Sequence, residues 1–263
     1  MIRNLAKAAL TAAAFALLAA CAPAEQSQPA DKSATGAADK ATTGAANKPV
    51  TGPAGKPATG PATGTSDAAV PRGQGFDFYV LALSWSPSYC EAEGEQANGQ
   101  QCRAGRPYGF VVHGLWPQYE RGYPENCPTN VSDVSSDRLH GLYDLIPSAG
   151  LIRHQWRKHG TCSGLGQDDY FKVLRAARDR IEIPKEFKSL ASYRTLAPGQ
   201  AERAFLQSNP DMPADAVAVT CDRRYLRELR ICMGKDLAFR ACPEIDRRAC
   251  RLDKVVMPPV RGR

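Results

Sequence analysis

The cysteines are the strongest constraint on what this chain can fold into. The 263 residues include nine cysteines, and all but Cys21 lie between Cys90 and Cys250. Without Cys21 the number is even, as four disulfides require. No Cys-x-x-Cys pair occurs, which argues against a structural zinc site. The cysteines therefore predict a disulfide-stabilised domain that folds in an oxidising compartment.

The N-terminus, residues 1–21, is expected to be an export signal. It has a basic start, an apolar run over residues 8–18, and small residues before Cys21. The apolar run is about half the roughly 20 residues that a membrane-spanning helix needs, so we expect a signal rather than an anchor helix. Leu18-Ala19-Ala20-Cys21 resembles the lipobox of bacterial lipoproteins, which predicts a lipid on Cys21. The alternative is an ordinary cleaved signal with a cysteine near the cut.

Residues 22–75 consist mainly of Ala, Gly, Thr, Pro and Lys, and contain no Phe, Trp, Tyr, Leu or Ile. Such a segment cannot bury enough apolar surface to offset the entropy lost on ordering. We expect a disordered linker, with an end-to-end distance on the order of 40 Å if it behaves as a flexible coil.

Residues 76–263 are expected to form one domain of the α+β class. Runs rich in β-formers predict strands at both ends of this region, and apolar residues at helical spacing predict helices in the middle. The predicted strands cover 76–83, 108–112, 216–220 and 229–233, with a hairpin continuing over 237–242. The predicted helices run from a cap at Asp168 to about 181, and from Pro198 to 206.

Three of the four histidines lie in two segments that are rich in glycine, tryptophan and polar groups. The segments are Phe110–Gln118 (FVVHGLWPQ) and His154–Cys162 (HQWRKHGTC). The second predicts a helix ending at Gly160, with Gln155 and His159 on one face and His154 and Lys158 on another. A single histidine is usually a surface or core residue, and we interpret His140 in that way. Three histidines beside a lysine favour a functional site.

The histidine pair in the second segment does not fit a zinc site. His154 and His159 are five residues apart, about 140° around a helix, whereas zinc-binding His-x-x-x-His pairs share a face. Lys158 would also repel a cation, so the cluster favours an anion. The net charge of the region from Phe76 onward, with 27 basic and 23 acidic residues, is +4 and suits an anionic partner without requiring one.

The two segments resemble the paired active-site motifs of the ribonuclease T2 family, His-Gly-Leu-Trp-Pro and His-Glu-x-x-Lys-His-Gly-Thr-Cys. The similarity also covers Leu83–Cys90 and the cysteine-rich C-terminal part. The resemblance implies a central antiparallel sheet flanked by helices, in an endoribonuclease. We see no oligomerisation signal in the sequence and expect a monomer with no obligate protein partner. It implies metal-independent cleavage of single-stranded RNA to 2′,3′-cyclic phosphates with broad base specificity, and no cofactor.

The resemblance also implies a role for each residue of the cluster. His159 would be the general base and His113 the general acid, while His154 would hold the phosphate and Lys158 would stabilise the developing charge. Gln155 departs from the family, which usually has glutamate there. An amide can donate a hydrogen bond to phosphate but cannot hold a proton, so we expect reduced or shifted activity.

Two further residues are expected to contact a base. Trp116 resembles the tryptophan that forms a wall of the base pocket in this family, although a core tryptophan is the alternative. Gln118 stands where some relatives have a base-contacting aspartate. Trp85 and Trp156 are expected in the core. The family pattern implies the disulfides Cys90–Cys102, Cys127–Cys162, Cys221–Cys250 and Cys232–Cys242.

Two other functions remain as alternatives. One is an RNA-binding envelope lipoprotein of the same fold that has lost turnover, with Gln155 as its only support. The other is a metal-binding envelope protein, whose function chelators would abolish. The export signal predicts a periplasmic or outer-membrane-tethered protein, or a secreted one. The membrane would be contacted only through the lipid on Cys21.

Overall fold

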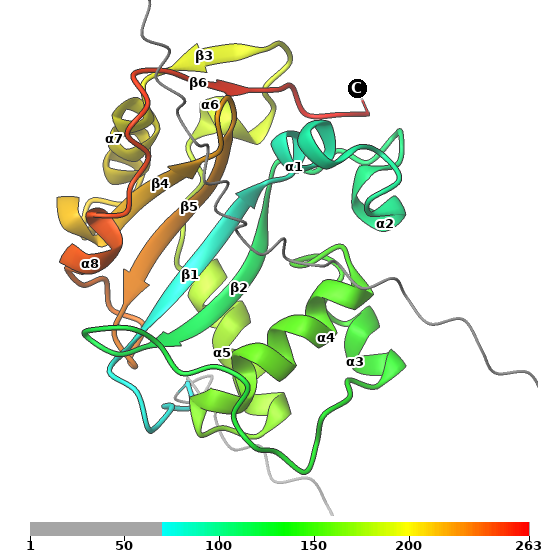
Figure 1. Cartoon of the computed structure of the whole chain (residues 1–263), viewed down its shortest axis with the longest axis vertical. Coiled ribbons are helices and arrows are strands. Elements are labelled where there is room, and N and C mark those ends of the chain that lie inside the picture. The colour runs from blue at the N-terminus through cyan, green and yellow to red at the C-terminus, as the bar shows by residue number, and fades with distance from the viewer. Residues whose placement is uncertain (1–69, 263) are drawn as a thin grey trace, which may run out of the picture. The chain divides into compact units, whose positions relative to one another are not determined.

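A computed structural model describes residues 70–262 (Figure 1). The predicted signal 1–21, its lipidated Cys21 and most of the predicted linker lie outside the described residues. The last linker residues are described, and the Gln74 N–H donates to the Ser163 carbonyl at 2.9 Å. Within the described part of the chain, no helix is both long and apolar enough to cross a membrane.

The centre of the fold is a four-stranded sheet in the order β2-β1-β5-β4. All its strand pairs are antiparallel. Its strands are β1 (Phe78–Trp85), β2 (Phe110–Gln118), β4 (Val217–Cys221) and β5 (Leu226–Met233). β3 (Arg194–Leu196) and β6 (Val255–Met257) form a separate two-stranded sheet. β1, with the sequence FYVLALSW, is almost entirely buried, as expected for a central strand rich in β-formers.

Helices surround this sheet, so the predicted α+β class and the antiparallel sheet are both confirmed. Figure 1 shows α3, α4 and α5 grouped near the β2 end of the sheet and α7 near β4. The helices are α1 (Ser86–Glu93), α2 (Gly99–Cys102), α3 (Ser136–His140), α4 (Ala149–Lys158), α5 (Gln167–Asp179), α6 (Lys185–Lys188), α7 (Pro198–Ser208) and α8 (Pro243–Asp246). Short 3-10 turns cover Gly160–Ser163 and Ala214–Ala216. The core contains Trp85 and Trp156, as predicted.

Three details of the predicted helices and of the predicted hairpin are wrong. Asp168 does not cap α5; it lies in the first turn, where its charge still favours the positive helix end, and Gly166 is the cap. The helix of the second histidine segment ends at Lys158 rather than Gly160. The hairpin over 237–242 is reduced to one bridge between Met233 and Phe239, because the chain turns at Leu237 with φ of 63°.

A β-bulge in β2 sets which side chains of the first histidine segment face the core. Ala82 of β1 pairs with Gly114, but Leu83 pairs with Val112, so His113 is the extra residue. Side chains alternate along a strand, and one extra residue reverses the faces beyond it. The bulge therefore lets Val112 and Leu115 both lie in the core, while Trp116 packs on the opposite face.

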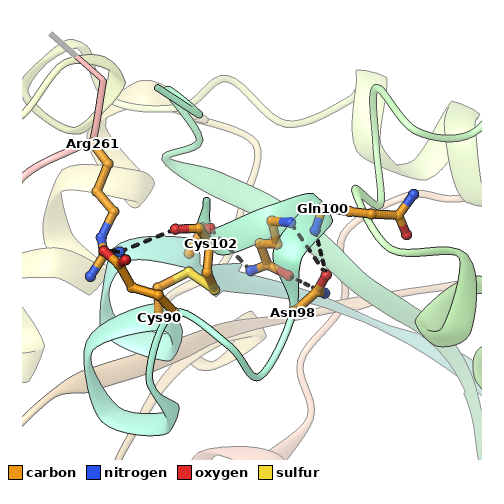
Figure 2. Close-up of a disulfide and its surroundings, with 8 residues drawn as sticks. Cys90, Asn98, Gln100, Cys102 and Arg261 are labelled. Carbon is orange, nitrogen blue, oxygen red and sulfur yellow. Dashed lines mark hydrogen bonds and ion pairs between the residues drawn. A yellow bond between two sulfur atoms is a disulfide. The ribbon is translucent and has the colours of Figure 1, made fainter. Parts of the chain in front are cut away.

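Four disulfides join distant parts of the domain, and the pairs are those that the family pattern implies. They are Cys90–Cys102, Cys127–Cys162, Cys221–Cys250 and Cys232–Cys242. The first ties α1 to α2, whose N-terminus is capped by Asn98 accepting from the Gln100 and Gln101 N–H groups (Figure 2). Arg261, near the C-terminus, donates to the Cys102 carbonyl at 3.2 Å.

Candidate active site

The two histidine segments fold onto neighbouring elements, the edge strand β2 and the C-terminal end of α4. The Ser148 hydroxyl caps α4 by accepting from the Leu151 N–H at 3.2 Å. The helix ends with Arg157 and Lys158, whose charges suit the negative end of the helix dipole. His159 follows as the C-cap, and its N–H still donates to the Gln155 carbonyl at 3.0 Å.

All the predicted catalytic and base-contacting residues line one cavity of about 360 Å³. These residues are His113, Trp116, Gln118, His154, Gln155, Lys158 and His159. Four residues that the sequence analysis did not single out complete the lining: Tyr123, Arg230, Ile245 and Arg248. The cavity therefore combines imidazole, cationic and aromatic groups and contains no carboxylate in its lining.

Trp116 lies between two of the histidines. Its ring centroid is 5.3 Å from that of His113, edge to face at 81°, and 5.4 Å from that of His159, tilted at 33°. Tyr123 lies beyond His159, with 6.5 Å between the ring centroids. The two imidazoles thus flank a single indole at one cavity.

His159 occupies an environment that opposes its protonation. Burial lowers its pKa to about 3, and the positive charges of Lys158, His154 and His113 act in the same direction. Its Nδ1 has no hydrogen-bond partner within the described part of the chain. At neutral pH this imidazole is uncharged and can accept a proton.

His154 is the more exposed of the two histidines in the second segment. Burial, then the charges of Lys158, Arg157 and His113, lower its pKa. It lines a second cavity of about 770 Å³ as well, and His113 is the other residue that lines both cavities. His113 and His154 therefore mark the place where the two cavities meet.

Lys158 forms an ion pair with Glu125, with 3.3 Å between Nζ and Oε2. Both side chains are more than a third exposed, so solvent screens this pair and it contributes little to stability. The ammonium is consequently free to exchange the carboxylate for another anion in the cavity.

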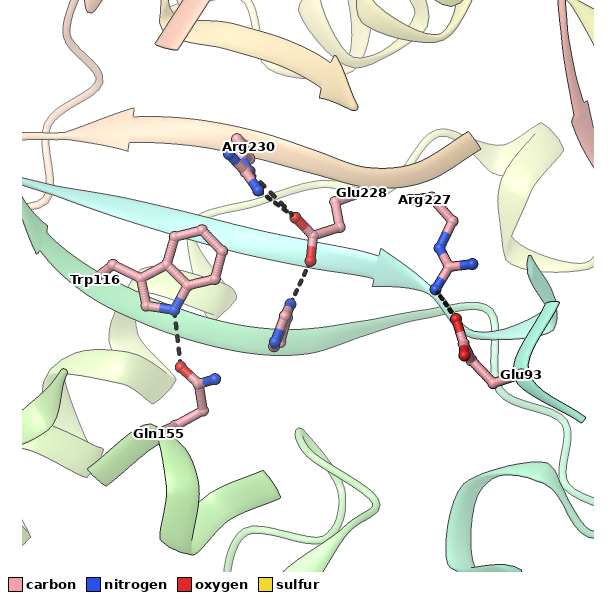
Figure 3. A network of polar contacts seen from close by, with 7 residues as sticks. Glu93, Trp116, Gln155, Arg227, Glu228 and Arg230 are labelled. Atoms are coloured by element: carbon pink, nitrogen blue, oxygen red, sulfur yellow. Dashed lines mark hydrogen bonds and ion pairs between the residues drawn. The ribbon is translucent and has the colours of Figure 1, made fainter. Parts of the chain in front are cut away.

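Gln155 supports Trp116. Its Oε1 accepts a hydrogen bond from the Trp116 indole at 2.8 Å, and the residue is only 1% exposed (Figure 3). Gly114 makes room for this pair, because a Cβ at Gly114 would overlap both the Gln155 amide and the indole nitrogen. The Nε2 group of Gln155 is the donor for the expected hydrogen bond to phosphate, and the bond from the indole to Oε1 fixes the orientation of the amide.

Gln118 is also largely buried, at 7% exposure. Its Nε2 donates one hydrogen bond to the Pro117 carbonyl at 3.1 Å. The second hydrogen of Nε2 and the Oε1 acceptor are not engaged by that bond, and the residue lines the cavity.

Comparison with known proteins assigns the chain and its fold to one family. A model of the ribonuclease T2 family matches residues 76–242. The chain belongs to the ribonuclease T2 family. It is 36% identical over 189 residues to a ribonuclease of Aeromonas hydrophila, covering 65% of this chain and 79% of the relative. It is 26% identical over 204 residues to ribonuclease I of Escherichia coli strain K12, covering 61% and 76%.

The fold of this T2 ribonuclease matches solved structures of the family. The crystal structure of RNase NT in complex with 5′-AMP superposes with a TM-score of 0.55, over 71% of this chain and all of that one, at 24% identity. Together with the family assignment and the named relatives, this makes the chain a T2-type endoribonuclease.

Sequence reasoning on this T2 ribonuclease missed two residues of β5 that lie against the site. Glu228 binds His113, and Arg230 binds Glu228 and lies over the Trp116 ring at 5.2 Å (Figure 3). The signal was present in the strand pattern, where Glu228 and Arg230 alternate with the core residues Leu229 and Ile231.

Within residues 70–262 there is no group of three or more His, Cys, Asp or Glu side chains that could hold a metal ion. His140 is exposed and lies outside both cavities.

Proposed function

We propose that this T2 ribonuclease cleaves single-stranded RNA by transfer of the phosphate to the 2′-oxygen, with His159 as the base and His113 as the acid. The observation that carries the proposal is the contrast between the two imidazoles around Trp116. His159 is buried among positive charges, which lower its pKa to about 3 and keep it neutral. His113 instead binds the carboxylate of Glu228 through Nδ1, so a negative charge lies beside this ring where positive charges surround His159.

The first half of the reaction needs a neutral base. His159 removes the proton from the 2′-hydroxyl, and the oxygen attacks the adjacent phosphorus. The bond between phosphorus and the 5′-oxygen then breaks, and His113 donates its proton to that oxygen. The products are a 2′,3′-cyclic phosphate and a free 5′-hydroxyl, so the protonation states of the two histidines are exchanged at the end.

The phosphate oxygens gain negative charge during the attack. Lys158 and His154 line the same cavity and supply positive charge and a hydrogen-bond donor for these oxygens. Lys158 exchanges its ion pair with Glu125 for the phosphate. DNA lacks the 2′-hydroxyl and is not cleaved.

The two cavities explain how a chain of nucleotides fits. They meet at His113 and His154, so a phosphate held there has room for a nucleotide on each side. Trp116 offers an aromatic face to a splayed base, and stacking of this kind tolerates any base. Broad base specificity follows.

Cleavage of single-stranded RNA by the purified oxidised protein in EDTA tests the proposal. We expect wild type to generate 2′,3′-cyclic ends, and His113→Ala and His159→Ala to lose at least about 100-fold in kcat, within the range for general acid–base groups. His140→Ala, an exposed histidine outside both cavities, is the matched control and should retain wild-type activity.

Other outcomes would identify the alternatives. Binding of RNA without turnover by a folded wild-type protein would favour the RNA-binding alternative, and Gln155→Glu would then be the variant to try. Loss of cleavage in EDTA with recovery on adding a divalent ion would contradict the metal-independent reaction.

We also propose that the enzyme is exported and tethered by a lipid on Cys21. Four disulfides fit an oxidising compartment, and the motif ending at Cys21 fits lipoprotein processing. Mass spectrometry of the mature N-terminus should find an acylated Cys21. An unmodified N-terminus would contradict the tether while leaving export intact.

A further inference from the structure

We propose that Glu228 is a positioning residue for the general acid, holding His113 through Nδ1 so that Nε2 is the nitrogen that delivers the proton. The inference rests on the proposed function, in which His113 protonates the leaving 5′-oxygen. It adds a residue of β5 to a proposed catalytic group that otherwise comes from β2 and the C-terminal end of α4.

The sheet brings Glu228 and His113 together across an intervening strand. β1 lies between β5 and β2, and its Ser84 pairs with Glu228 while its Ala82 pairs with Arg230. On the other side Ala82 pairs with Gly114. The small side chains of Ala82 and Ser84 leave the face of β1 open, so the longer Glu228 side chain can reach His113 over it.

Both carboxylate oxygens of Glu228 are occupied. Oε1 binds the His113 Nδ1, and Oε2 accepts from the Arg230 Nε at 3.1 Å and from its terminal nitrogen at 3.0 Å (Figure 3). The Glu228 side chain is 11% exposed. Burial by itself raises the pKa of Glu228, but the hydrogen bonds and charges of His113 and Arg230 outweigh it and leave the pKa lowered. The carboxylate is therefore charged at neutral pH.

A charged carboxylate only accepts hydrogen bonds, so the Nδ1 of His113 must carry a proton in both protonation states of the ring. The proton that comes and goes is then on Nε2. The edge-to-face contact with Trp116 limits rotation of the ring from the other side. Arg230 binds Glu228 and also lies over the Trp116 ring. The same arginine therefore contacts both the partner of His113 and the aromatic side chain proposed to stack on a base.

A merely structural role for Glu228 makes a different prediction about leaving groups. If Glu228 acts through the acid, its loss should matter only when the leaving oxygen needs a proton. A 4-nitrophenolate leaves without one. If Glu228 only stabilises the sheet, its loss should lower the rate of cleavage equally for both kinds of substrate.

The experiment compares two substrates for the purified, oxidised full-length protein: a dinucleoside phosphate, and a nucleoside 3′-(4-nitrophenyl phosphate). Glu228→Ala should lower kcat on the dinucleoside phosphate by about 10- to 100-fold, the range found when the hydrogen-bond partner of a metal-binding histidine is removed. It should lower kcat on the nitrophenyl ester by less than about 3-fold, with KM nearly unchanged on both. Glu228→Gln, which keeps an acceptor but not the charge, should give an intermediate loss with the same substrate dependence.

Glu202→Gln is the matched control. Glu202 is partly buried and accepts from the Val219 N–H at 2.8 Å, outside both cavities, so its substitution should leave kcat on both substrates unchanged. Equal losses on the two substrates in the Glu228 variants, or no loss at all, would overturn the inference.

The failure of the inference and of the proposed function can be told apart. His113→Ala should itself show the dependence on leaving group; if it does not, His113 is not the acid and the proposed function fails. If His113→Ala shows it and the Glu228 variants do not, only the inference fails. Should the variants not fold, nitrogen NMR of the wild type with His113 neutral must find the proton on Nδ1; a proton on Nε2 would refute the inference.

Discussion

His159 and His113 are chemically identical side chains that this fold places in opposite surroundings. His159 sits among Lys158, His154 and apolar groups, and its pKa falls to about 3. His113 has the Glu228 carboxylate as its partner. Their identities could be predicted from the two motifs, but the difference between them could not, because it arises from burial and from a residue 115 positions away in the chain.

The low pKa of His159 predicts how activity depends on pH. A base works only when neutral, so kcat/KM falls as pH drops below the pKa of the free base. Because this pKa is lowered, kcat/KM should stay high as pH falls from 6.5 to about 5, where an ordinary histidine would be mostly protonated. Gln155→Glu would add a negative charge to the same cavity, favour protonated His159 and move the acid limb to higher pH.

Initial rates on a dinucleoside phosphate between pH 3.5 and 8 measure this limb for both proteins. Gln155→Asn keeps an amide and is the uncharged control. An unchanged kcat and pH profile in Gln155→Glu would show that the departure from the family's glutamate has no kinetic consequence.

Among the secondary-structure elements, β2 extends further than predicted and contains the whole first histidine segment. The predicted strand covered residues 108–112. The strand in fact runs to Gln118. It is an edge strand, where Pro117 need not donate to a second neighbour, and its bulge at His113 accommodates the switch of faces.

Gly114→Ala tests the close packing on this strand. The added methyl would overlap the Gln155 amide and the Trp116 indole nitrogen, so we expect a loss of about 1 to 3 kcal/mol in unfolding free energy and lower activity. Gly150→Ala is the control, because its Cβ would meet no atom within 4 Å and it lies in α4. Urea unfolding and rates on RNA measure both, and equal behaviour of the two variants would contradict the packing argument.

At the scale of the whole molecule, one disulfide joins the stability of the domain to its active site. Cys127–Cys162 ties the segment containing Tyr123 and Glu125 to the turn that follows His159. The Asn126 N–H also donates to the Lys158 carbonyl at 2.8 Å. The disulfide thereby restrains both walls of the smaller cavity.

Replacing both Cys127 and Cys162 by serine should therefore lower activity as well as stability. The two cysteines are separated by 35 positions, which corresponds to about 4 kcal/mol of loop entropy, against about 3 kcal/mol for the separation of 10 between Cys232 and Cys242. The double serine variant at Cys232 and Cys242 should lose stability but keep most of its kcat. Thermal unfolding and kcat on RNA separate the two, and unchanged kcat in the first variant would exclude the restraint.

The fold class, the approximate strands and long helices, and seven of the eleven residues that line the smaller cavity could be predicted from the sequence. These depend on local features: the periodicity of apolar residues, the cysteines, and two motifs whose residues fold onto adjacent elements. The contacts of Glu228 with His113 and of Gln155 with Trp116, and the neutral state of His159, could not be predicted in this way. Those contacts depend on strand order, on a one-residue bulge and on burial, which bring together charges from distant segments. How much one charge shifts the pKa of a neighbouring group depends on how far both are buried from water.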